Sequence, residues 1–124
     1  MSILLALAAQ AAIAPPPPAV ADEIVVIARK MKAWKGSVTK RDGKIACRTT
    51  KSTRDREIDG IRCNAMVACT APLDGDLTRL SADKSLPASE RRKRIDALLQ
   101  TTLPCIEERN DAGTRALAER RARA

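Results

Sequence analysis

The chain contains no histidine, no tyrosine and no phenylalanine, and Trp34 is its only aromatic residue. Histidine is the commonest general base in enzymes and tyrosine a frequent acid, so the usual acid–base and histidine-activated nucleophile sites are excluded. A Ser/Lys dyad or a carboxylate pair stays formally open. Four cysteines could hold zinc, but structural zinc sites use closely spaced ligand pairs, and here the cysteine intervals are irregular with no Cys-x-x-Cys. We therefore expect no catalytic residues, no metal site and no cofactor.

The shortage of aromatic side chains also limits the core, because aromatics supply much of the buried area in small domains. The core must consist of Ile, Leu, Val, Met and Ala, and thin cores of this kind often require covalent cross-links. The chain has four cysteines, Cys47, Cys63, Cys69 and Cys105. This even number fits a framework of two disulfides.

Element lengths favour one of the three ways to pair these cysteines. The four residues of strand that follow Cys47 span about 13 Å at about 3.3 Å each. A helix that starts near Arg54 and returns beside the strand covers this distance in about nine residues at about 1.5 Å each. Nine residues after Arg54 is Cys63. We therefore predict Cys47–Cys63, and Cys69–Cys105 as the second bridge. A thiol-redox or metal-binding protein that uses the four cysteines remains the alternative.

No apolar run is long enough to cross a membrane, which takes about 20 residues. The longest is the uncharged stretch Ile3–Ala14, followed by Pro15–Pro18 and by Ala19-Val20-Ala21 before Asp22. This is the pattern of a secretory signal peptide with cleavage after Ala21, although no Lys or Arg precedes it. Ala12-Ile13-Ala14 is a second possible cleavage site, disfavoured by the proline that follows. We predict a signal peptide at 1–21 and export to the periplasm or the extracellular space.

The net charge of +8 comes from one region of the chain. Residues 29–54 contain ten basic side chains against Asp42 alone, a net charge of +9, so the remainder of the chain carries −1. In this region Asp42-Gly43 separates two segments of strand character, Ala33–Lys40 and Lys44–Thr50. An Asp-Gly pair in this setting predicts a β-hairpin.

The hairpin turn fixes which residues share a face. It places Lys40 opposite Ile45 and Val38 opposite Cys47, and successive side chains of a strand point to opposite faces. The predicted core face carries Trp34, Val38, Ile45 and Cys47. The opposite face carries Lys35, Thr39, Arg41, Lys44 and Arg48.

We predict that Lys35, Arg41, Lys44 and Arg48 form an anion-binding face. Clustered Lys and Arg bind polyanions through release of counterions, without any base-specific contact. Stacking on single-stranded nucleic acid requires exposed aromatics, and Trp34 is directed inward. For an exported protein, the expected partners are therefore anionic envelope polymers or lipid headgroups and not a specific nucleic acid.

The remaining elements follow from hydrophobic spacing and turn residues. Glu23–Arg29 contains a β-branched run and predicts a strand. A helix near Arg54 is capped by Ser52 or Thr53. The inner face of that helix carries Ile58, Ile61, Ala65 and Cys69.

Leu73–Ala88 predicts a loop, with one helical turn at residues 77–82 and a solvated Asp74-Gly75-Asp76 turn. Ser89 caps a second helix, and Pro104 kinks or ends it. We expect residues 22–109 to form one α+β domain. In it, a small antiparallel sheet of two to three strands packs on two helices and is stapled by the disulfides. The Arg/Ala-rich tail at 110–124 is expected to be a frayed helix or disordered.

The stretch Asp22-Glu23-Ile24-Val25-Val26-Ile27-Ala28 resembles the start of mature outer-membrane receptors of proteobacteria. The match covers seven residues of a chain far too short to form such a barrel, so it implies no function. As a whole, the chain resembles the small uncharacterised exported proteins of alphaproteobacteria. That group has no assigned activity to transfer to any residue.

The sequence therefore favours a non-enzymatic exported envelope protein that acts by binding or by structural interaction. The basic hairpin is the candidate contact surface. No feature of the sequence identifies a ligand, a pathway or an oligomeric state.

Overall fold

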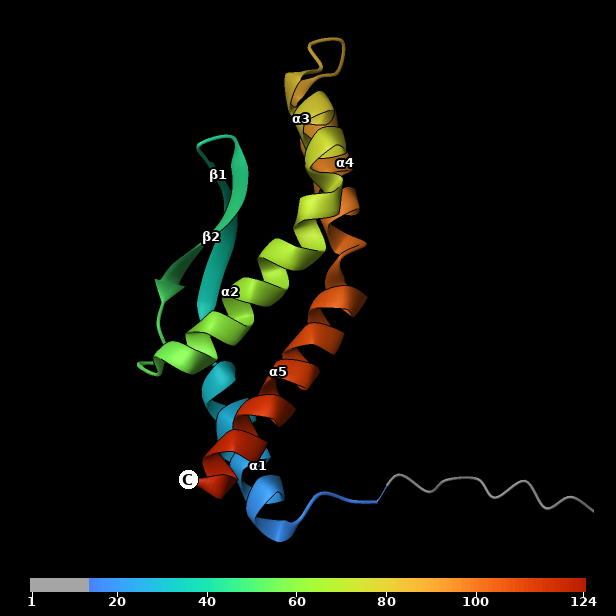
Figure 1. Ribbon diagram of the computed structural model, residues 1–124. Helices are drawn as coiled ribbons and strands as arrows, with labels where there is room; N and C mark the ends of the chain where they lie inside the picture. Colours follow the sequence, from blue (N-terminus) through green and yellow to red (C-terminus); the bar gives the residue numbers. More distant parts are fainter. Residues whose placement is uncertain (1–13) are drawn as a thin grey trace, which may run out of the picture.

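The computed structural model describes residues 14–124, and they form an α+β fold (Figure 1). In these residues the sheet has two antiparallel strands, which confirms the predicted class. The helices are more numerous than the two predicted. In chain order the elements are α1 (Pro18–Met31), β1 (Lys35–Arg41), β2 (Lys44–Lys51), α2 (Arg56–Thr70), a 3₁₀ turn (Ala71–Leu73), α3 (Asp74–Ala82), α4 (Ala88–Gln100) and α5 (Leu103–Arg123).

The predicted strand over Glu23–Arg29 is wrong, because these residues lie within α1. The residues of α1 that pack into the core recur every three or four positions, as one face of a helix requires. Val25 and Val26, in the middle of the β-branched run, are 55% and 45% exposed. Packing of one helical face therefore overrides the local preference of the run for a strand. The packed residues are Val20, Ile24, Ile27 and Met31.

Helix α1 also crosses the predicted cleavage site after Ala21. Val20, the second residue before this site, is 8% exposed and belongs to the core cluster. A chain that began at Asp22 would lose this core residue and the first turn of α1, whereas cleavage after Ala14 would keep both. The predicted apolar signal core, residues 3–14, lies outside the described residues except for Ala14.

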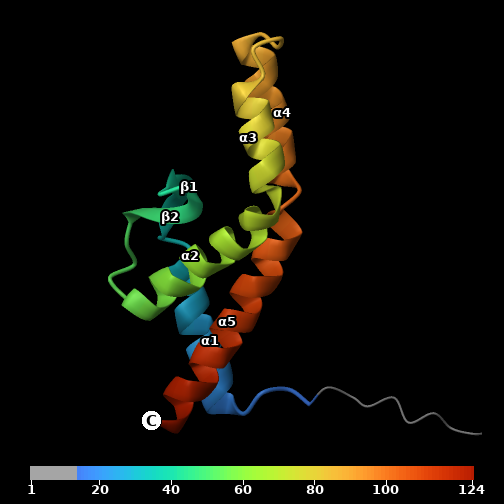
Figure 2. The same cartoon turned by 45° about the horizontal axis from the view of Figure 1, so that its top comes forward.

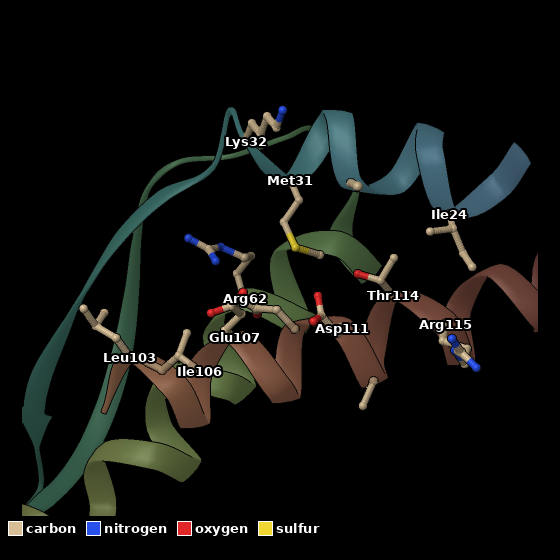
Figure 3. A pocket seen from close by; sticks show the side chains of 13 residues that line it. Ile24, Met31, Lys32, Arg62, Leu103, Ile106, Glu107, Asp111, Thr114 and Arg115 are labelled. Carbon is tan, nitrogen blue, oxygen red and sulfur yellow. The ribbon is translucent and has the colours of Figure 1, made fainter. Parts of the chain in front are cut away.

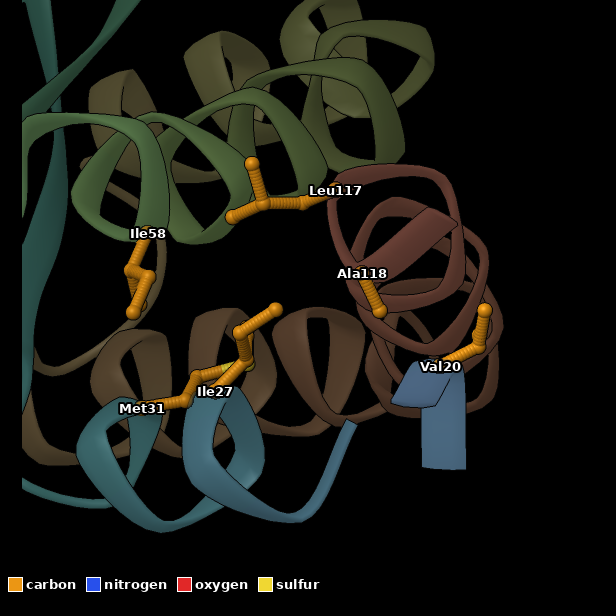
Figure 4. Packing of buried hydrophobic residues seen from close by; sticks show 6 residues of the cluster. All are labelled: Val20, Ile27, Met31, Ile58, Leu117 and Ala118. Carbon is orange, nitrogen blue, oxygen red and sulfur yellow. The ribbon is translucent and has the colours of Figure 1, made fainter. Parts of the chain in front are cut away.

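The core lies where α1, α2 and α5 meet (Figure 4). Ile27 comes from α1, Ile58 from α2, and Leu117 and Ala118 from α5, and each is at most 2% exposed. The tail predicted to be frayed or disordered, Asn110–Ala124, is therefore corrected. It is the second half of α5, it lies beside α1, and it completes the core.

The N-terminus of α2 is capped by Asp55, and not by Ser52 or Thr53 as predicted. The backbone N–H groups of Glu57 and Ile58 donate to Asp55 Oδ1 at 3.2 and 3.3 Å. Arg121 Nη2 of α5 donates to both carboxylate oxygens of Asp55, at 2.9 and 2.8 Å. Burial alone would raise the pKa of Asp55, but the bonds from Arg121 and from the backbone outweigh it and hold that pKa below its usual range.

Helices α3 and α4 form an antiparallel pair, the arm, that projects away from the core (Figures 1 and 2). No residue of α3 or α4 is buried. The predicted loop at Leu73–Ala88 is wrong for residues 74–82, which form α3. Ser89 lies inside α4 and makes no cap, whereas Pro104 lies in the first turn of α5, as the predicted break requires.

Both predicted disulfides are confirmed. Cys47–Cys63 joins β2 to α2 with a Cα–Cα distance of 5.4 Å. Cys69–Cys105 joins the end of α2 to the start of α5 with a Cα–Cα distance of 5.9 Å. The first fixes the hairpin on α2, and the second closes the base of the arm.

Candidate functional site on the hairpin

The hairpin has the predicted turn and register. Asp42 and Gly43 have φ values of +52° and +74°, the left-handed pair that a tight two-residue hairpin turn requires. Val38 pairs with Cys47, and Lys40 pairs with Ile45. The division into two faces therefore follows the prediction.

The inner face of the hairpin packs on α2 around Trp34, which is 5% exposed. Trp34 Nε1 donates to Thr49 Oγ1 at 3.1 Å. The indole lies over Gly36, where a Cβ atom would stand 2.3 Å from the ring, so only glycine fits. The Arg62 guanidinium of α2 lies 5.0 Å from the centre of the Trp34 ring, within range of a cation–π contact. Val38, Ile45 and Cys47 are half-buried on the same face.

The outer face, by which we mean Lys35, Arg41, Lys44 and Arg48, is turned to solvent. All four side chains are exposed. Among the residues that the structure describes, none of the four lies within 4 Å of a carboxylate. The structure thus brings the four predicted residues together as an uncompensated positive surface.

The strand register places like charges directly opposite each other at both ends of the hairpin. Arg41 pairs with Lys44 beside the turn, and Lys35 pairs with Lys51 at the open end. Like charges that face each other across two strands destabilise a sheet. These two pairs therefore lower the stability of the hairpin.

Lys40 is the basic residue of the hairpin whose role the sequence analysis missed. It lies on the inner face, and its Nζ is 3.0 Å from Asp74 Oδ1 and donates to Thr78 Oγ1 at 3.0 Å. This bond links the hairpin to α3 across a hollow of about 510 Å³ between the hairpin and the arm. The alternation of β1 puts Lys40 inward, but its partner depends on where α3 lies.

The arm's basic run, Arg91–Arg94, differs from the outer face of the hairpin. Arg94 Nε lies 3.4 Å from Glu90 Oε1, one turn away on the same helix. Arg91 Nη1 donates to the Asp83 carbonyl at 3.1 Å. Both partners lie on the arm itself, so this run is less free to bind an external anion than the outer face of the hairpin.

The remaining candidate chemistry was thiol or metal chemistry. All four cysteines are bonded in the two disulfides. In the described part of the chain, no cluster of three or more His, Cys, Asp or Glu side chains is placed to hold a metal ion. The Asp74-Gly75-Asp76 turn is the start of α3, where Asp74 binds Lys40 and Asp76 pairs with Arg79.

Comparison of the chain with models of known protein families, with curated proteins and with solved structures finds no match. Between residues 14 and 124, no helix combines the length and the apolar character that a membrane span requires. The outer face of the hairpin therefore stands as the candidate site on its own geometry.

Proposed function

We propose that the protein is an exported, non-enzymatic protein of the cell envelope that docks on anionic surfaces through the outer face of its hairpin. The observation that carries this proposal is a group of four exposed cations with no acidic partner in the described residues. Three of the four, Lys35, Arg41 and Lys44, stand opposite another cation across the strands. A charge pattern that costs stability is expected where the charges serve binding.

Rigidity supports the same proposal. The inner face is held on α2 by Trp34 and by the Cys47–Cys63 bridge, so the outer face is presented without a prior ordering step. Binding to a preorganised surface avoids the entropy of fixing it. The two disulfides are typical of an oxidising compartment, which favours export and an envelope surface as the partner.

Flotation of the protein with lipid vesicles tests this function. We expect binding to phosphatidylglycerol-containing vesicles that weakens as salt rises, and none to neutral phosphatidylcholine vesicles. Changing the four outer-face residues to Gln removes about 1 kcal/mol per charge, about 4 kcal/mol in all, which is on the order of a thousandfold in affinity. The matched control carries the same charge change on other exposed residues, namely Lys84, Arg92, Lys93 and Arg109.

The control variant is expected to keep the wild-type affinity within about threefold, well under 1 kcal/mol. An equal loss of vesicle affinity in both variants would show that only net charge matters, and it would contradict a specific role for the outer face. Immobilised heparin, run with the same two variants, shows whether an anionic polymer can replace the lipid surface.

Thiol counting separates this proposal from the thiol-redox alternative. Alkylation of the native protein followed by mass measurement should find no reactive thiol, because all four cysteines are bridged. The same intact mass gives the N-terminus of the exported form. Since Val20 belongs to the core, we expect the mature chain to retain it.

A further inference from the structure

A groove of about 920 Å³ runs between α1 and α5, and Arg62 of α2 also lines it (Figure 3). Its size falls in the range of small-molecule sites. Apolar side chains from both helices line it, among them Ile24 and Met31 of α1 and Leu103 and Ile106 of α5. Leu103 is 53% exposed, so part of this apolar lining is open to solvent. The groove is therefore suited to an apolar body.

Two polar groups of the groove have no partner within the described residues. Asn110 of α5 is 8% exposed, and its Oδ1 is buried and accepts no hydrogen bond. The Nε of Arg62 is likewise buried and donates to no acceptor. Leaving a buried polar group unpaired costs about 1–3 kcal/mol, and more for a charged group. Both groups line the same groove, one as an acceptor and the other as a cation.

Arg62 is held in place although no carboxylate pairs with it in the described residues. Its guanidinium stacks on Trp34, and burial lowers the pKa of Arg62. Lys32 adds a second cation to the same lining, while Glu107 and Asp111 lie along α5 (Figure 3). These two carboxylates disfavour a ligand with several negative charges and accept hydrogen bonds from N–H groups.

A matching ligand needs three features. It needs an anionic acceptor for Arg62, an N–H donor for Asn110 Oδ1, and an apolar side chain to cover Leu103 and Ile106. A carboxylate next to an amide N–H on an apolar body has all three. We propose that the groove binds a small apolar N-acyl amino acid or short peptide through its free carboxylate, with Arg62 as the charge partner and Asn110 as the amide acceptor.

Trp34 supplies a direct signal for the test, because it is the only aromatic residue and it contacts Arg62. The probe is N-acetyl-Leu-Leu, and its control is the same dipeptide with a C-terminal amide in place of the carboxylate. We expect a saturable change in Trp34 emission with the acid and at least about tenfold weaker binding of the amide. Proton NMR of the dipeptide provides a second readout that does not depend on Trp34.

Three variants locate the binding. Arg62→Met and Asn110→Leu should each weaken binding of the acid at least about tenfold. Arg92→Met, the same change at an exposed residue of α4, should leave it unchanged. Asn110→Leu keeps the stacking of Arg62 on Trp34, so it reports on the groove even where Arg62→Met alters folding, and circular dichroism verifies the fold of each variant.

Equal affinity for the acid and the amide would overturn the proposal. Binding that survives both groove variants would also overturn it, as would the absence of saturable binding by emission and by NMR. The vesicle experiment on the hairpin is independent of these outcomes, because the two sites share no residue.

Discussion

The two faces of the hairpin are built from the same fourteen paired residues and one turn, yet one face packs against the protein and the other is open to solvent. The inner face is mostly apolar, carries the Cys47–Cys63 bridge and covers α2. The outer face is cationic and makes no ion pair in the described residues. Stability is concentrated on the inner face, and the outer face reduces it. Substitutions on the two faces should therefore change different measurements.

Trp34→Ala should have the largest effect on the inner face. Trp34 is 5% exposed and bridges β1, β2 and α2, and large-to-small changes at such positions cost about 3–5 kcal/mol. Denaturant unfolding followed by circular dichroism measures the loss, since the variant has no aromatic fluorophore. Arg48→Ala on the outer face is the control, with an expected change within about 0.5 kcal/mol. Equal losses would abolish the distinction between the faces.

Removal of the Cys47–Cys63 bridge by substitution of both cysteines with Ala should cost about 2–4 kcal/mol. The bridge closes a loop of 16 residues and holds the inner face on α2. The emission of Trp34 should also shift, because its packing loosens. The same change at Cys69 and Cys105 is the matched control. It should cost a similar free energy but leave the Trp34 emission as in the wild type.

Asp55→Ala should lower the free energy of unfolding by about 0.5–2 kcal/mol through loss of the α2 cap. Helix α2 supports the inner face, so this change acts on one face from a distance. Asp55→Asn keeps an oxygen acceptor for the backbone and loses only the charge that pairs with Arg121. We expect it to lie between wild type and Asp55→Ala in urea unfolding. A larger loss for Asn than for Ala would contradict the capping role.

Stability should fall in acid because of carboxylates at the start of α2. Burial by itself would raise the pKa of Asp55 and of Asp59, but hydrogen bonds outweigh it and lower both. The hydrogen bond from Arg120 lowers the pKa of Glu57. A carboxyl group whose pKa is lowered in the folded protein stabilises the fold at pH values above its pKa in the unfolded chain, which is about 4. That contribution is lost as pH falls through the folded pKa. Urea unfolding between neutral pH and about pH 2 measures it. The Asp55→Asn variant should show a weaker dependence.

Lys44→Glu should have the smallest effect on stability, and the opposite sign. It replaces the like-charge pair Arg41/Lys44 with an opposite-charge pair, worth about 0.2–1 kcal/mol across two strands. We expect a higher denaturant midpoint with an unchanged dependence on denaturant concentration. The gain should shrink in high salt, because both side chains are exposed. A lower midpoint would show that Lys44 makes a stabilising contact.

The hairpin and the disulfides could be predicted because local rules determine them. The Asp42-Gly43 turn fixes the register, the register sets the two faces, and strand and helix rises bring Cys47 next to Cys63. Once the first pair is chosen, Cys69 and Cys105 are left to each other. All four outer-face residues follow from the same alternation.

The errors arose where tertiary packing decides the structure. Ile24–Ile27 is too short a run to distinguish strand from helix, and the partner that settles it is α5, about 90 residues away. In α5 the core residue Ala118 is small, so the sequence pattern does not mark it as apolar core. Asp74 and Asp76 resemble turn residues, but acidic side chains also favour the first turn of a helix. The groove at Arg62 is lined by residues of three helices, so no local sequence pattern predicts it.

The most direct test of this account is the affinity of Lys44→Glu for phosphatidylglycerol-containing vesicles at low salt, measured beside Lys93→Glu in α4. The account predicts that Lys44→Glu loses about 2 kcal/mol of binding, roughly thirtyfold, from a change of two charges at the surface. Its stability should rise in the same preparation. Lys93→Glu changes the net charge equally and should bind much as the wild type does. Wild-type binding by Lys44→Glu, or an equal loss in both variants, would contradict a docking role for the outer face.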